Sequence, residues 1–197
     1  MERAEWDRRY AESGLLWSSQ PNRFLVAEVA NLQAGRALDL ACGEGRNAVW
    51  LGGLGWKVTG VDFSEVAIAK AREQARAAGV DAEWIVADLV DYRPPARAFD
   101  LVIVFYLQVP ARDRARILPA AAEAVAEGGM FLLVGHDSRN LVTGYGGPRD
   151  PDVLYTPEEI VADLAGLHIE RAELVERPVE TPEGVRVALD ALVRARR

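Results

Sequence analysis

The sequence is poor in the residues that mark secreted, metal-bound and membrane-inserted proteins. It holds one cysteine, Cys42, and two histidines among 197 residues, so no disulfide can form within the chain. No apolar run approaches the roughly 20 residues that cross a bilayer, and the charged residues 1–7 (MERAEWD) lack the apolar core of a signal peptide. We therefore expect a cytoplasmic protein with no membrane partner.

An excess of positive charge is also missing. The chain carries 23 lysines and arginines against 30 aspartates and glutamates, a formal net charge of −7. A protein that binds nucleic acid through its phosphates needs a basic face, so we expect no nucleic-acid partner. Hydrophobic residues make up 50% of the chain, which is enough to bury a core and excludes a disordered chain.

What the sequence does contain is an alternation of strand and helix patterns. Short apolar strands are predicted at residues 37–41, 57–62, 82–86, 100–105 and 130–134, and helices at 48–54, 65–78, 112–126 and from 156 onward. Two further strands, 167–176 and 185–194, are joined by so short a connection that only antiparallel pairing is possible. The pattern predicts an α/β three-layer sandwich that ends in an antiparallel hairpin.

Two segments are predicted to cover a ligand site. Residues 1–35 hold two short helical patterns and an aromatic loop with Trp17, and we interpret them as an N-terminal helical lid on a single domain whose ligand-binding part is 36–197. Residues 137–155 form a long loop rich in glycine and proline, and loops of that length are usually functional. An anionic or polar ligand would be held there by Arg139, Asn140, Tyr145 and Arg149.

A glycine turn between the first strand and the next helix predicts an adenosine-bearing ligand. Gly43, Gly45 and Ala48 fit the pattern G-x-G-x-x-G/A, and Asp62 ends the next strand 19 residues after Gly43. The glycines let the backbone approach a ligand, and the acid can accept from a ribose diol. The motif alone does not separate a dinucleotide from other adenosine ligands.

Further acids favour a cationic ligand over a dinucleotide. Asp39 lies in the first strand and Glu44 in the turn, where they would repel a pyrophosphate and attract an ammonium or a sulfonium. Asp88 and Leu89 end the third strand, where a carboxylate and an amide can read an adenine edge. The length also leaves no room for a second domain that would carry a hydride acceptor.

The runs 38–45 (LDLACGEG), 58–64 (VTGVDFS) and 87–89 (ADL) resemble those of class I S-adenosylmethionine-dependent methyltransferases. The GEGRN run at 43–47 and the chain ending at 183–196 are similar to the tellurite-resistance-type and thiopurine-type small-molecule branch. The resemblance implies a Rossmann-like, mostly parallel seven-stranded sheet of order 3-2-1-4-5-7-6. Two departures stand out: Ala41 replaces a common glycine, and no Asn/Asp-Pro-Pro-aromatic tetrapeptide, typical of amino-methylating enzymes of nucleic acids, follows the fourth strand.

The resemblance also implies which residues bind the cofactor, S-adenosylmethionine, and its product S-adenosylhomocysteine. Gly43, Gly45 and Asp39 would lie by the methionine moiety, and Asp62 and Phe63 by the ribose and adenine. Asp88 and Leu89 would read the adenine edge, and Phe105 and Tyr106 would flank the methyl donor and the acceptor. The implied cofactor set is completed by Trp17, Ala41, Asn47 and Ser64.

Methyl transfer from a sulfonium is an in-line displacement that depends on alignment and a dry cavity, so we expect no metal. A base matters only for an acceptor that binds protonated. His136, at the end of the fifth strand, is the candidate catalytic base, because an imidazole takes up a proton near neutral pH. Tyr106 is the second candidate catalytic residue, and His168 is less favourably placed.

The resulting hypothesis is a methyltransferase that acts on a small-molecule acceptor: a thiol, oxyanion, phenol or metalloid. Its partner would be that acceptor, and the protein would be a monomer or a homodimer. Two alternatives stay open. One is an NAD(P)-binding oxidoreductase, favoured by the G-x-G-x-x-A pattern, and the other is a non-catalytic module that binds S-adenosylmethionine and acts through a partner.

Overall fold

The computed structural model describes residues 3–12 and 14–197 and contains a seven-stranded sheet of order β3-β2-β1-β4-β5-β7-β6. The predicted strand order is therefore confirmed. The strands are β1 (Arg36–Leu40), β2 (Lys57–Asp62), β3 (Ala82–Val86), β4 (Phe99–Phe105), β5 (Val125–His136), β6 (His168–Thr181) and β7 (Gly184–Arg196). The helices are α1 (Arg3–Glu12), α2 (Arg23–Val29), α3 (Arg46–Gly53), α4 (Glu65–Ala77), α5 (Ala111–Ala124), α6 (Asn140–Thr143) and α7 (Pro157–Ala162), with a 3₁₀ turn at Pro151–Val153.

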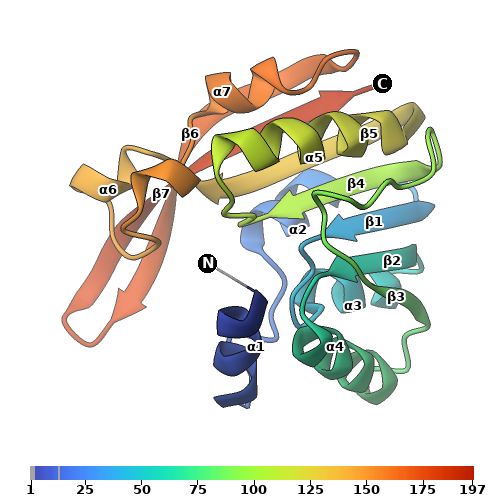
Figure 1. Cartoon of the computed structure of the whole chain (residues 1–197), viewed down its shortest axis with the longest axis horizontal. Coiled ribbons are helices and arrows are strands. Elements are labelled where there is room, and N and C mark those ends of the chain that lie inside the picture. Colours follow the sequence, from blue (N-terminus) through green and yellow to red (C-terminus); the bar gives the residue numbers. More distant parts are fainter. Residues whose placement is uncertain (1–2, 13) are drawn as a thin grey trace.

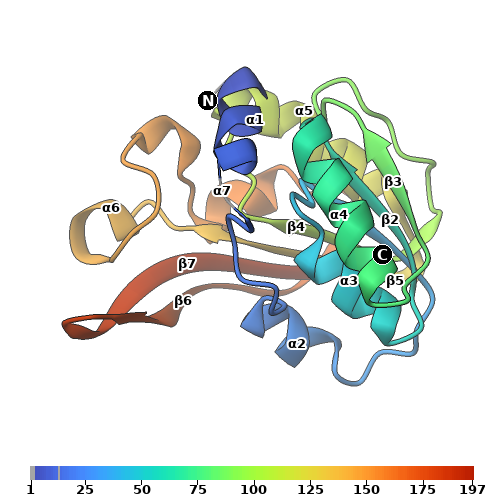
Figure 2. The same cartoon turned by 90° about the horizontal axis from the view of Figure 1, so that it is seen from below.

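The sheet lies between two layers of helices, as predicted (Figures 1 and 2). Strands β1 to β5 are parallel, and β7 pairs antiparallel with both β5 and β6. One face packs on α5 and α7 through residues such as Leu118 and Ile160, and the other on α2 and α3 through residues such as Leu25 and Leu51. Parallel strands buried on both faces need such continuous apolar runs.

Two predicted helix starts are confirmed by their hydrogen bonds. The Ser64 hydroxyl accepts from the Ala67 amide at the start of α4. At the start of α7, the Thr156 hydroxyl accepts from the Glu159 amide while the Glu159 carboxylate accepts from the Thr156 amide, which is a capping box. The starts of α4 and α7 are thus determined by their local sequence.

The predicted boundary between α5 and β5 is wrong. The helix was expected to reach residue 126 and the strand to begin at 130, but β5 follows α5 directly from Val125. Val125 pairs with Phe99, and the register then shifts before Leu101 pairs with Met130. Gly128, at φ 73°, lets the chain bulge without leaving the sheet.

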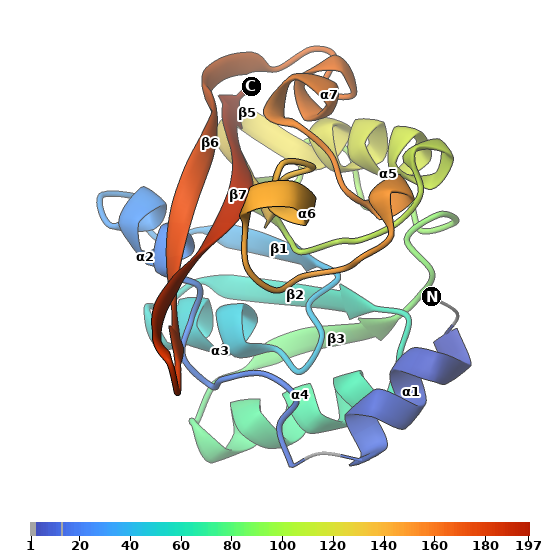
Figure 3. The same ribbon diagram turned by 90° about the vertical axis from the view of Figure 1, so that its left-hand side faces the viewer.

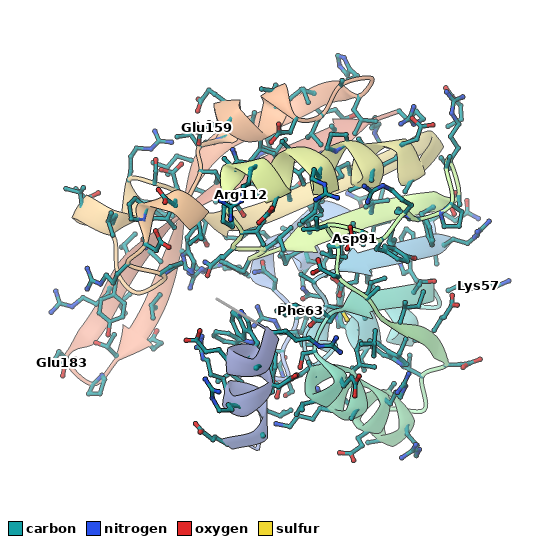
Figure 4. All side chains as sticks on the ribbon, viewed as in Figure 1. Lys57, Phe63, Asp91, Arg112, Glu159 and Glu183 are labelled. Carbon is teal, nitrogen blue, oxygen red and sulfur yellow. The ribbon has the colours of Figure 1, made fainter. Side chains whose placement is uncertain are left out.

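The C-terminal hairpin is longer than predicted and projects beyond the C-terminal ends of the parallel strands (Figure 3). His136 opposite Asp190 is the last pair between β5 and β7. From there β6 and β7 pair only with each other, as far as Thr181 and Gly184. Glu183 marks the free tip of this hairpin in Figure 4. One side of the hairpin is thereby brought to the edge where a ligand is expected.

Among residues 3–12 and 14–197, no helix combines the length and apolar character needed to pass through a bilayer.

Candidate functional site

A cavity of about 670 Å³ lies at the C-terminal ends of the parallel strands. Its lining includes these predicted site residues: Trp17, Ala41, Gly43, Asn47, Asp62, Phe63, Phe105, Tyr106 and His136. The other predicted residues, which lie outside the lining, are Asp39, Gly45, Ser64, Asp88 and Leu89. The cavity therefore joins the glycine turn to the two candidate catalytic residues in one space.

The glycine turn is braced by the carboxylate of Asp62. One Asp62 oxygen accepts from the Gly43 amide and the other from the Ser64 amide, each at 2.9 Å. Burial raises the pKa of Asp62, although these backbone hydrogen bonds oppose the rise. Because each carboxylate oxygen has a second lone pair, Asp62 can hold the turn and still accept from a ribose hydroxyl.

Close approach explains the small residues of the turn. Gly43 has a φ of 54°, and a Cβ at this position would lie 3.0 Å from the phenol oxygen of Tyr10. Ala41 also adopts a positive φ of 60°, a backbone region that glycine enters at lower cost. The alanine that departs from the family pattern therefore keeps the geometry for which glycine is suited.

Asp39 is a buried carboxylate without a partner. It is 1% exposed, and neither oxygen forms a hydrogen bond with the described residues. Burial and the neighbouring Asp62 carboxylate raise the pKa of Asp39 to about 8, while Arg46 and the Ala48 amide oppose the rise. An uncompensated buried acid beside the turn fits a ligand that carries positive charge, as S-adenosylmethionine does.

Glu44, which was expected to attract that positive charge, holds the N-terminal segment instead. Its carboxylate accepts from the Leu16 amide at 2.9 and 3.1 Å and from the Trp17 amide at 3.2 Å. Lys70 Nζ lies 3.2 Å from the same carboxylate and donates to the Gly14 carbonyl at 2.9 Å. These contacts fasten the loop with Trp17 over the glycine turn.

The end predicted to hold adenine is more open. Lys57 and Phe63 mark the two ends of β2 in Figure 4, with Phe63 at the end nearer α1. The Asp88 carboxylate is exposed and accepts from the Val90 amide, whereas Leu89 packs in the core. The adenine-reading roles of Asp88 and Leu89 stay predictions.

The opposite end of the cavity carries a polar cluster with Asp190 at its centre. Asp190 Oδ2 accepts from the Tyr106 hydroxyl at 2.8 Å and from Arg177 Nε at 2.6 Å. His136 Nδ1 lies 3.3 Å from Asp190 Oδ1, and its ring lies 5.0 Å from the Tyr106 ring. Burial raises the pKa of Asp190, but the hydrogen bonds from Arg177 and Tyr106 and the nearby His136 ring outweigh this effect, so the pKa is lowered.

Sequence reasoning missed Arg177 and Asp190. They lie on the hairpin strands, where alternating polar residues usually face solvent, and no motif marks them. One signal was present: Asp190 is the sole acid in the apolar run 187–193 (VALDALV). A charge within such a run indicates either a break in the strand or a buried partner.

The loop at 137–155 contributes less than expected to the site, since Gly147 and Pro148 are its part of the cavity lining. Arg139 is paired with the buried Asp137. Asn140 bridges the Gly146 carbonyl and the Leu189 amide. The anion-holding role predicted for Arg139, Asn140, Tyr145 and Arg149 is therefore not supported by the cavity, because these side chains do not line it.

Known proteins match the chain in sequence and in fold. The family model described as "Methyltransferase domain" matches residues 37–129. A thiopurine S-methyltransferase of Pseudomonas putida is 25% identical and aligns over 98% of this chain and 96% of its own. A structure from work on the conversion of a disulfide bond into a thioacetal group during echinomycin biosynthesis has a TM-score of 0.77 at 26% identity, covering 99% of this chain and 92% of its own.

Two further observations define how far these matches reach. TehB of Haemophilus influenzae has a TM-score of 0.73 at 18% identity, over 99% of this chain and 66% of its own, and so shares the fold. The chain spans only 45 to 61% of the length of the first curated relatives, which are methyltransferases. None of the relatives named here is an NAD(P)-dependent oxidoreductase. Together with the strand order, the matches assign residues 37–129 to the methyltransferase domain family, give the chain the fold that TehB shares, and support S-adenosylmethionine as the cofactor.

Proposed function

We propose that the protein transfers the methyl group of S-adenosylmethionine to a small-molecule acceptor. The observation that carries this proposal is the shared cavity: the glycine turn with Gly43 lines one end, and Tyr106 and His136 line the other. A cofactor bound over the turn would direct its reactive carbon toward the second end. That end is bounded by the hairpin and by Pro148, which favours a compact acceptor.

Charge complementarity supports this orientation of the cofactor. Asp39, an acid without a partner, would compensate the ammonium and the sulfonium, and Asp62 would accept from the ribose diol. Arg46 lines the cavity, and no described residue gives it a hydrogen bond or salt bridge. Burial and Arg177 lower the pKa of Arg46. A carboxylate, from cofactor or acceptor, could form the salt bridge that Arg46 lacks.

The protein's own contribution is alignment and exclusion of water. The bound cofactor supplies an electrophilic methyl carbon on a sulfonium. Phe105 and Tyr106 would hold the acceptor in line with that carbon, and Trp17 would close the cavity from the N-terminal side. We infer that the described part of the N-terminal segment, residues 3–12 and 14–35, acts as a cover over the bound cofactor, held by the Glu44 contacts.

Two relatives that align along nearly the whole chain point to sulfur chemistry. One is named a thiopurine S-methyltransferase, and the other comes from the work on thioacetal formation from a disulfide. Thiols are therefore the first acceptors to test, followed by phenols, oxyanions and metalloid compounds. Shorter matches include a tRNA methyltransferase of Pyrococcus horikoshii, so an RNA arm belongs in the same experiment.

The test is a methyl-transfer screen with radiolabelled S-adenosylmethionine over thiols, phenols, amines, oxyanions and transfer RNA. We expect label in a small product and not in RNA. His136→Asn should lower turnover of acceptors that bind protonated while leaving affinity for S-adenosylhomocysteine unchanged. Label in RNA alone would contradict a small-molecule acceptor, and no transfer despite cofactor binding would favour a non-catalytic binding module.

A further inference from the structure

The buried carboxylate of Asp190 is surrounded by three polar side chains at the cavity wall: His136, Arg177 and Tyr106. The Asp190 side chain is 0% exposed and that of His136 is 12% exposed. A carboxylate is costly to bury unless its partners compensate its charge. Such an arrangement at the wall of a cavity indicates a site in which the position of a proton is controlled.

Strand pairing puts the cluster together. Asp190 on β7 lies directly opposite His136 on β5 and opposite Val175 on β6. Residues two apart share a face of a strand, so Arg177 lies on the same face as Val175 and reaches Asp190. The peptide at Tyr106, with a φ of 55°, turns after β4 and places its hydroxyl on the same carboxylate.

We propose that Asp190 is a positioning residue that orients His136 as the base of the methyl transfer, and that the acceptor binds as a neutral weak acid, a thiol or a phenol. This inference rests on the proposed function. Nδ1 of His136 is buried and forms no hydrogen bond with the described residues, and Asp190 Oδ1 lies 3.3 Å from it. A small rotation of the ring would align an Nδ1–H with Asp190 Oδ1, as catalytic hydrogen bonds often tighten on binding. The lone pair of Nε2 is then free to face the cavity.

The charged groups around His136 determine which charge on the acceptor is favoured. Arg177 compensates Asp190, and Tyr106, with a pKa raised by burial and by Asp190, stays a neutral donor. Asp137, next to His136, is already paired with Arg139. Arg46 also lines the cavity, close enough to Arg177 for the two charges to interact. These two cations make the end of the cavity near His136 unfavourable for an ammonium acceptor and favourable for one that develops negative charge.

The step conserves charge. The X–H bond of the acceptor breaks and its proton passes to Nε2 of His136, while X forms a bond to the methyl carbon and the carbon–sulfur bond breaks with its electron pair left on sulfur. The positive charge of the sulfonium is thereby replaced by that of an imidazolium above Asp190. An acceptor that is ionised before it binds needs no such transfer.

The test uses the protein without cofactor, because its two histidines give separable imidazole signals in NMR. His168→Gln assigns them. In the wild-type protein, the neutral His136 ring should carry its proton on Nδ1. Asp190→Asn should raise the share of the neutral ring that carries its proton on Nε2, whereas Arg177→Gln, which keeps the carboxylate, should leave the proton on Nδ1.

A matched control is Asp163→Asn, which breaks another partly buried Asp–Arg pair, with Arg114, outside the cavity. It should leave the His136 signal unchanged. A proton on Nε2 in the neutral ring of the wild-type protein, or the same change of tautomer in both variants, would overturn the inference. The tautomer measurement needs no variant, so a variant that fails to fold does not remove the test.

Kinetics supply the second arm. For thiol or phenol acceptors, Asp190→Asn should lower kcat by about 100-fold or more and shift the acidic limb of the pH profile to lower pH, with KM for S-adenosylmethionine unchanged. An equal loss with an acceptor that is already ionised would contradict the inference. Absence of S-adenosylhomocysteine binding to the wild-type protein would instead contradict the proposed function, so the two failures are distinguishable.

Discussion

At the scale of single residues, the unusual groups are carboxylates whose burial is compensated in different ways. Asp62 is compensated by two backbone amides and Asp190 by Arg177, Tyr106 and His136. Asp39 has no such compensation. Burying Asp39 lowers the stability of the free protein. A cationic ligand would remove this penalty on binding, because it supplies the missing positive charge.

This arrangement predicts that cofactor binding releases a proton at Asp39. With a pKa of about 8, the free protein holds this carboxyl largely protonated at pH 7, and a bound ammonium would favour the ionised form. Calorimetry of S-adenosylhomocysteine binding in buffers of different ionisation enthalpy measures the release. Asp39→Asn should abolish it and weaken binding by about 1–3 kcal/mol, whereas the exposed Asp91→Asn should change neither.

The same group gives the free protein a pH-dependent stability. The unfolded Asp39 releases its proton near its ordinary pKa of 3.8 and the folded one near 8, so the folded state binds more protons in between. The free energy of unfolding should therefore fall as the pH rises from about 4 to 8. Asp62, whose pKa is also raised, acts in the same direction. Denaturant titrations of Asp39→Asn should show a flatter dependence, and an unchanged slope would contradict the assignment.

Asp62→Ala should affect stability as well as binding. The substitution leaves the buried amides of Gly43 and Ser64 without acceptors, and each unsatisfied group costs about 1–3 kcal/mol. We expect a lower melting temperature and weaker S-adenosylhomocysteine binding together. Asp62→Asn, which keeps one amide oxygen as an acceptor, should lose less stability. Full stability in the alanine variant would show that the turn does not depend on this carboxylate.

At the scale of elements, Glu44 links two segments that are distant in sequence. The link predicts that Glu44→Gln loosens the loop at residues 14–20 without unfolding the sheet. The hydrogen bonds from the loop amides would then go to a neutral amide oxygen, and the salt bridge to Lys70 would be lost. Hydrogen exchange at the Leu16 and Trp17 amides should accelerate, while exchange in β1 and β4 stays slow. Unchanged exchange at these two amides would show that the segment is held elsewhere.

Gly147 positions the loop against the candidate base. It has a φ of 77°, and a Cβ there would lie 3.0 Å from the His136 ring. Gly147→Ala should therefore displace the ring or the loop and lower turnover while leaving cofactor affinity intact. Gly146→Ala is the matched control, since its φ of 71° imposes the same backbone strain but its Cβ would meet no atom within 4 Å. Equal losses in both variants would assign the effect to strain alone.

These elements also show what the sequence could and could not reveal. The strands and the glycine turn were predictable because their signals are local: apolar runs, and Gly43 with Asp62 at a recognisable spacing. The order of the strands followed from the resemblance to a known family. The start of β5 was not, because the glycines at 128 and 129 mark a bulge as readily as a loop. Arg177 and Asp190 depend on which strands become neighbours, which is a property of the assembled sheet.

At the scale of the whole molecule, ligand binding should be visible as stability. S-adenosylhomocysteine at one hundred times its dissociation constant should stabilise the folded state by about 2.7 kcal/mol, which raises the melting temperature by several degrees. NADH should produce no shift, because its pyrophosphate cannot supply the positive charge that the buried Asp39 lacks. A shift with NADH and none with S-adenosylhomocysteine would contradict the cofactor assignment.

The projecting hairpin separates the two proposed tasks of the cavity along the chain. The proposed cofactor-binding residues Asp39, Gly43 and Asp62 lie before the end of β4, whereas Arg177 and Asp190 belong to a ribbon that pairs with the rest of the sheet along a single edge. Such a ribbon can diverge or be exchanged while the cofactor-binding half is left intact. Relatives that share the first half of this chain are thus free to differ in what they methylate, and a hairpin transplanted between two of them would carry acceptor preference with it.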